Sequence, residues 1–205
     1  MFALVDKSDN SITRMLNGNK GITIGDNQYP RAIFSLWSEA ERNAINIYTV
    51  TIDESKRKDE KWYINTNITY AFDGTNATGS YGDATAKAHA NTTWTQEQID
   101  DGDAPDGADT DTVAVEGLKT KLIRTVKAQA EGELNKTDWY ITRKAEKSTA
   151  VPSSITTHRD AVRTKQASME TAITNASNTA ALETLYTYTT TDGVTSRPLG
   201  ELPKL

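Results

Sequence analysis

The segment from residue 76 to residue 111 most constrains the fold, because few of its side chains could join a hydrophobic core. Gly, Ala, Thr, Asn and Asp dominate it, and its large apolar residues are Tyr81, Trp94 and Ile99. Residues 100–111 are rich in Asp and also contain Gly and Pro. Such composition is typical of a solvated linker. We therefore expect separate folded parts on either side of an acidic linker over 76–111.

The composition of the whole chain agrees with thin layers of structure. Hydrophobic residues make up 36% of the 205 residues, and the mean hydropathy is -0.62. This fraction is below the usual range for a globular domain, so a large single core is not expected. The net charge of -5 argues against nucleic acid as a partner, since phosphate binding needs clustered Lys and Arg. Cysteine is absent, which excludes disulfides and thiolate chemistry.

The sequence predicts no contact with a membrane. No apolar run approaches the ~18 residues that a membrane-spanning helix requires. The first residues, MFALVDK, have neither a basic start nor a long apolar stretch, so they are not a signal peptide.

Residues 1–75 predict a small β-rich domain for docking to a partner. The strongest strand signal is 46–52, which is rich in β-branched and aromatic residues. Further strands are expected at 2–5, 11–16, 21–24, 61–64 and 67–72. One short helix, 38–45, interrupts them. Ser38 and Glu41 have the spacing of a capping box, with Trp37 placed to pack just before it.

Residues 112–186 predict a helical region. The first helix, 112–136, has an apolar stripe in which three- and four-residue spacings separate consecutive members; its members are Val115, Leu118, Leu122 and Val126. Thr137 and Asp138 are expected to cap a second, short helix that carries Trp139 and Tyr140.

A third helix should follow the break at Pro152. Ser153 or Ser154 can cap it, and it should extend to about Ser177. Its predicted apolar face contains Ile155, Val162, Met169 and Ile173. Leu182 and Leu185 indicate one more helical turn, and residues 187–205 predict an extended tail with little to bury. The predicted fold class is α+β, with a small N-terminal β-rich domain containing a short helix, an acidic linker, and a C-terminal helical hairpin or arm.

The sequence contains no strong catalytic or metal-binding motif. We therefore expect that the protein is not an enzyme and has no cofactor, no metal and no catalytic residue. His89 and His158 are the only histidines, and neither has an acidic residue at helical metal spacing. The acidic loop from Asp101 departs from the calcium-loop register, and Thr112 stands where a bidentate Glu is needed. A remote alternative is a carbohydrate-active surface protein, which would need a carboxylate pair in an aromatic cleft; the available acids are Asp53, Glu54, Asp59 and Glu60.

Two segments carry a family resemblance. The first is ITIGDNQYPRAIFSLWSEAERNAINIYTVTID, and the second is LNKTDWYITRKAEKSTAVPSSITTHRDAVR. Together they resemble bacteriophage tail-associated structural proteins and tail-fibre assembly proteins over about half of the chain. The matching positions in the first segment are Tyr29, Pro30, Phe34, Trp37, Glu41, Ile47 and Tyr48. Asn46 stands where the pattern has Gly, and His158 stands where it has Tyr.

The resemblance implies a non-enzymatic structural component of a bacteriophage virion, in the tail, the baseplate or the tail-fibre attachment. It would act through protein–protein interfaces with other phage structural proteins, as a homo-oligomer or ring, after assembly in the cytoplasm of the bacterial host. The alternative is a tail-fibre assembly chaperone that the particle does not retain. The residues expected to contact partners are Trp139, Tyr140, Arg143, Arg159, Arg163 and Trp37.

Overall fold

The computed structural model describes all residues from 1 to 205, and the protein is mixed α+β, as predicted. It forms two compact units, Met1–Thr85 and Ala86–Leu205. The first unit is therefore longer than the predicted domain of residues 1–75. None of the helices is both long enough and apolar enough to cross a bilayer.

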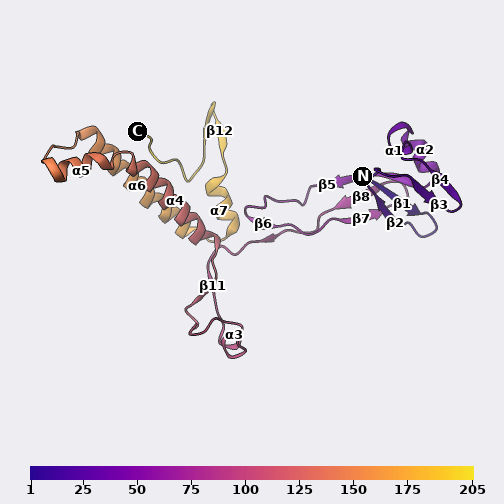
Figure 1. Cartoon of the computed structure of the whole chain (residues 1–205), viewed down its shortest axis with the longest axis horizontal. Helices are drawn as coiled ribbons and strands as arrows, with labels where there is room; N and C mark the ends of the chain where they lie inside the picture. Colours follow the sequence, from indigo (N-terminus) through magenta and orange to yellow (C-terminus); the bar gives the residue numbers. More distant parts are fainter. The chain divides into compact units, whose positions relative to one another are not determined.

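A five-stranded sheet organises the first unit (Figure 1). The strand order is β2-β1-β5-β8-β7, and every neighbouring pair is antiparallel except β5–β8. The two edge strands, β2 and β7, also contact each other, so the sheet nearly closes into a barrel. The strands are β1 (Phe2–Asp6), β2 (Ser11–Leu16), β5 (Ile47–Asp53), β7 (Thr69–Phe72) and β8 (Ala77–Ser80), and a short strand, β6 (Tyr63–Ile64), lies between β5 and β7 in the chain.

Alternation along the strands builds two hydrophobic clusters, because successive side chains point to opposite faces. One cluster comprises Ala3, Val5, Tyr48, Val50, Phe72 and Ala77. The other is centred on Ile22, Ile33 and Ile47. Four short elements contribute to or surround the second cluster: β3 (Ile22–Ile24), β4 (Asn27–Tyr29), α1 (Ile33–Leu36) and α2 (Glu39–Ala44). β4 and α1 were not predicted from the sequence.

The predicted capping box at the start of α2 is confirmed. The Ser38 hydroxyl accepts from the Glu41 backbone N–H, and the Glu41 carboxylate accepts from the Ser38 backbone N–H at 2.7 Å. After α2 the chain turns through Asn46, whose φ is 62°. Glycine adopts this left-handed conformation most easily, and asparagine tolerates it.

Strand β8 corrects the prediction of a linker from residue 76. Ala77 is 1% exposed, and Gly79 is buried beneath its neighbours. A Cβ at Gly79 would lie 2.8 Å from Ile52 Cδ1 and 2.8 Å from Tyr70 Cε1. The strand has small residues because no space exists for larger ones, and small residues give no strand signal in a sequence.

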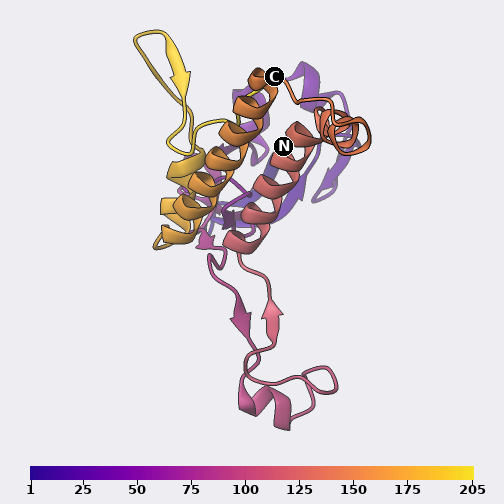
Figure 2. The same ribbon diagram turned by 90° about the vertical axis from the view of Figure 1, so that its left-hand side faces the viewer.

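Two long antiparallel helices, α4 (Leu118–Asn135) and α6 (Ser153–Asn175), form the body of the second unit (Figure 2). The Lys119 ammonium at the start of α4 donates to the Thr174 carbonyl near the end of α6, at 2.8 Å. The apolar face predicted for α6 is confirmed, since all four residues are at most 8% exposed. Pro152, rather than a serine, occupies its N-cap position.

Helix α4 begins at Leu118 and not at residue 112, because the preceding residues form a β-ribbon. β10 (Thr92–Thr93) pairs with β11 (Val113–Val115), and β-branched residues favour this strand conformation. Val115 is 57% exposed and does not join the helical stripe. A short helix, α3 (Gln96–Asp100), follows β10 and begins with a capping box formed by Thr95 and Gln98. Strand β9 (Thr85–Ala86) lies at the boundary of the two units.

The C-terminal residues fold further than the extended tail that was predicted. Helix α7 (Thr179–Tyr186) is followed by a hairpin of β12 (Thr189–Thr191) and β13 (Val194–Ser196). Leu199 is 2% exposed, and its backbone N–H donates to the Leu185 carbonyl at 3.0 Å. The tail therefore buries an apolar side chain after the hairpin returns the chain to α7.

Candidate partner-binding surface

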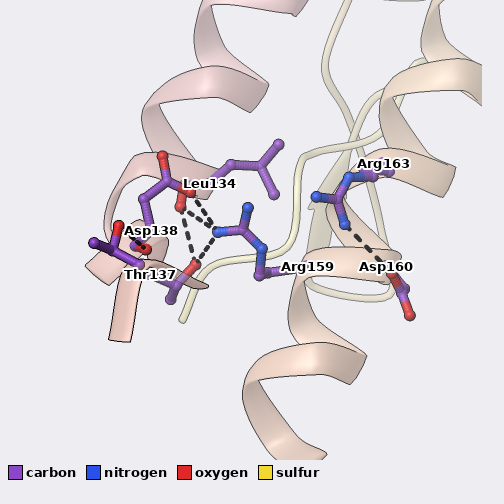
Figure 3. Close-up of polar contacts among 7 residues, drawn as sticks. Leu134, Thr137, Asp138, Arg159, Asp160 and Arg163 are labelled. Carbon is purple, nitrogen blue, oxygen red and sulfur yellow. Dashed lines mark hydrogen bonds and ion pairs between the residues drawn. The ribbon is translucent and has the colours of Figure 1, made fainter. Parts of the chain in front are cut away.

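The start of helix α5 (Asp138–Lys147) is fixed by one buried side chain, Arg159 of α6 (Figure 3). Its Nη1 donates to the Leu134 carbonyl at 2.8 Å, to the Thr137 hydroxyl at 2.7 Å and to an Asp138 carboxylate oxygen at 2.7 Å. Thr137 is fully buried, and its hydroxyl donates to the same Leu134 carbonyl at 2.9 Å. These bonds join the end of α4, the start of α5 and the first turns of α6.

The predicted side-chain cap of Thr137 on α5 is absent. Thr137 is the N-cap residue, but its hydroxyl makes no capping hydrogen bond to α5. The hydroxyl instead bonds to Leu134 and Arg159, which are outside α5. The threonine was thus identified correctly as the boundary residue, but its contacts depend on a side chain 22 residues later in the chain.

An aromatic surface follows directly after this fixed point. Trp139 is 51% exposed, and its ring lies 3.8 Å from the Tyr140 ring, centroid to centroid, with 32° between the planes. The Arg143 guanidinium lies 4.7 Å from the Trp139 ring centroid and 5.4 Å from that of Tyr140. We call Trp139, Tyr140 and Arg143 the α5 face. Cation–π contact with both rings holds the arginine against them.

The other residues expected to contact partners lie elsewhere. Arg159 is 8% exposed and is committed to bonds within the chain, so it supports the α5 face from behind. Arg163 is exposed but pairs with Asp160 of the same helix at 3.4 Å (Figure 3). Trp37 belongs to the first unit, where its ring packs edge-on against Tyr29 at 5.9 Å. Trp37 is partly buried there and packs against the cluster centred on Ile22, Ile33 and Ile47.

Exposed apolar area on α5 extends beyond the residues that the sequence singled out. Ile141 is 43% exposed, in addition to the half-exposed Trp139. No sequence pattern marked it, because an isoleucine in an amphipathic helix is normally expected on the buried side. The last turn of α5 contains Lys144 and Lys147, and neither forms an ion pair within the chain.

The acids considered for carbohydrate chemistry are engaged in local turns. Glu54 and Glu60 both lie near the Arg57 guanidinium, at 3.5 and 3.3 Å. Hydrogen bonds from Ser55 lower the pKa of Asp53, whereas a general acid needs a raised pKa. No group of three or more His, Cys, Asp or Glu side chains is placed to hold a metal ion.

Comparison of the chain with protein-family models, with curated proteins and with solved structures finds no match.

Proposed function

We propose that this protein is a non-enzymatic structural component of a bacteriophage virion that acts through protein–protein interfaces. The observation that carries the proposal is the α5 face, where a half-exposed Trp139 is stacked and held in a fixed place. The virion setting rests on the resemblance of two sequence segments to tail-associated proteins.

An exposed and ordered tryptophan supports a role in binding. Trp, Tyr and Arg are the residues most enriched among those that dominate interface energies. Here all three are stacked together, so little side-chain freedom remains to be lost when a partner binds. The buried Arg159 network fixes the helix that presents them. The α5 face is therefore preorganised for a partner surface.

The residues behind the resemblance support the same site. In the second segment, the Arg159 guanidinium donates to both Thr137 and Asp138. Trp139 and Arg143 of that segment form the surface that these bonds hold in place. The segment that carries the resemblance thus includes both the buried anchor and exposed residues of the α5 face.

Quantitative mass spectrometry of purified phage particles tests the proposal. We expect this chain at several copies per particle. Trp139→Ala in the phage genome should lower its copy number in particles. The matched control is Leu36→Ala, which truncates an apolar side chain that is 80% exposed in the other unit. This substitution should leave the copy number in particles unchanged. A chain that is abundant in infected cells but absent from particles would contradict the proposal and indicate the assembly chaperone instead.

A further inference from the structure

The two segments that flank helix α4 carry opposite net charge. The segment before it, residues 91–117, contains no Lys, Arg or His, and its eight acidic residues are Glu97, Asp100, Asp101, Asp103, Asp106, Asp109, Asp111 and Glu116. We call this segment the acidic arm. After α4, residues 136–147 contain four basic and two acidic residues. Two of these six are already paired, Lys136 with Glu133 and Asp138 with Arg159.

The acidic arm is folded and is not a loose linker (Figure 2). Its β10–β11 ribbon continues at Trp94, whose backbone N–H donates to the Thr112 carbonyl at 3.2 Å. At its base, the Asn91 side-chain oxygen accepts from the Gly117 backbone N–H at 2.9 Å and from the Thr120 hydroxyl at 2.7 Å. A Cβ at Gly117 would lie 2.2 Å from the Ala90 carbonyl oxygen, so this close approach needs glycine.

The arm and the α5 face are complementary in chemistry. Glu116 of the arm pairs with Arg124 of α4. The arm presents its other carboxylates together with two exposed valines, Val113 at 43% and Val115 at 57% exposed. The α5 face presents aromatic rings and Arg143, with the unpaired Lys144 and Lys147 on the same helix. Opposite charges across an interface guide encounter and fix its register, while the apolar groups at its centre supply affinity.

These two surfaces lie at opposite ends of one helix. Gly117 ends the arm directly before α4, and α5 begins just after it. The 18 residues of α4 separate them by about 27 Å at 1.5 Å per residue. A second copy of the chain, in contrast, can present its arm to the α5 face of the first.

We propose that the acidic arm of one copy docks on the α5 face of the next, head to tail. The inference rests on the proposed function, in which repeated copies build a particle, and it names the surfaces they use. The contact uses the arm of one copy and the α5 face of the other, so the docked pair retains one free arm and one free α5 face. The contact is therefore heterologous and generates a ring or a filament.

Sedimentation of the purified full-length chain tests this contact. We expect self-association at about 50 mM salt that weakens at about 500 mM salt, because the charges are exposed and screened. Trp139→Ala should weaken association about 30-fold. The triple variant Asp101→Asn, Asp103→Asn, Asp106→Asn should weaken association to a similar extent. The matched charge control is Asp26→Asn, Glu39→Gln, Glu131→Gln, which removes three exposed acids outside the arm and should associate like the wild type.

Mixing the two impaired variants gives the decisive result. At a protein concentration between the dissociation constants of the wild type and of the weakened variants, each variant alone should be monomeric. An equimolar mixture should then form a 1:1 dimer and nothing larger, because one variant retains the arm and the other retains the α5 face. A mixture that stays monomeric, or a wild type that is monomeric at low salt, overturns the head-to-tail contact. A monomeric wild type still found in particles would overturn this contact alone, whereas an associating chain absent from particles would overturn the proposed function alone.

Discussion

Arg159→Leu should destabilise the helical unit by removing the side chain that joins α4, α5 and α6. The Leu134 carbonyl would keep two donors, the Thr137 backbone N–H at 3.0 Å and the Thr137 hydroxyl at 2.9 Å, so it adds little to the cost. The Thr137 hydroxyl is fully buried and would lose its charged donor, a bond of about 1.5–3 kcal/mol. The Asp138 side chain is 52% exposed, and its share is about 0–1 kcal/mol. We therefore expect a loss of about 1.5–4 kcal/mol in the free energy of unfolding.

Urea unfolding followed by far-UV circular dichroism measures this loss, and amide hydrogen exchange locates it. Exchange should accelerate most in α5, the helix that loses its anchor. Arg163→Leu is the matched control, because it makes the same substitution one turn later in α6 and breaks only the exposed pair with Asp160. Arg163→Leu should lower the free energy of unfolding by less than about 1 kcal/mol. Equal losses for the two variants would refute the role assigned to Arg159.

Other substitutions test the packing and capping arguments. Gly79→Ala should destabilise the β-rich unit by about 1–3 kcal/mol in urea unfolding, because its Cβ would overlap Ile52 and Tyr70. In α4, a Cβ at Gly132 meets nothing within 4 Å, so Gly132→Ala should instead stabilise the helical unit by about 0.5–1 kcal/mol. Changes of the same sign in the free energy of unfolding for both glycine variants would contradict the packing argument. Hydrogen bonds from Ser38 lower the pKa of Glu41 below its ordinary 4.5. The capping box therefore stabilises α2 fully above pH 4.5, and this stabilisation is lost as the pH falls through the lowered pKa of Glu41. The backbone amide resonances of Ser38 and Glu41 should report the loss, and Glu41→Gln should abolish its pH dependence.

Local signals explain the elements that were predicted correctly from the sequence. The capping box of Ser38 and Glu41 lies within four residues, and the apolar face of α6 repeats within a single helix. Interactions of this kind depend on neighbours in the chain, so a pattern of residue types is enough to identify them. The α+β class follows from the same local patterns.

Long-range packing explains the elements that were missed. β8 has small residues because β5 and β7 leave no space, and nothing near Gly79 in the chain indicates those neighbours. Val115 fits a helical stripe by its spacing, yet it pairs with Thr92 across the ribbon. Leu199 is buried only because the hairpin before it returns the chain to α7.

The candidate site divides in the same way. The sequence by itself determined that one helix ends just before Thr137, that a second helix begins at Thr137 and Asp138, and that this second helix carries Trp139 and Tyr140. These features follow from local capping and helical patterns. Only the tertiary structure decided that Arg159 is an internal anchor while Trp139 is half exposed. An arginine and a tryptophan in amphipathic helices can each face inward or outward, and the direction is set by what the neighbouring helix offers: here, a carbonyl, a hydroxyl and a carboxylate that need a donor.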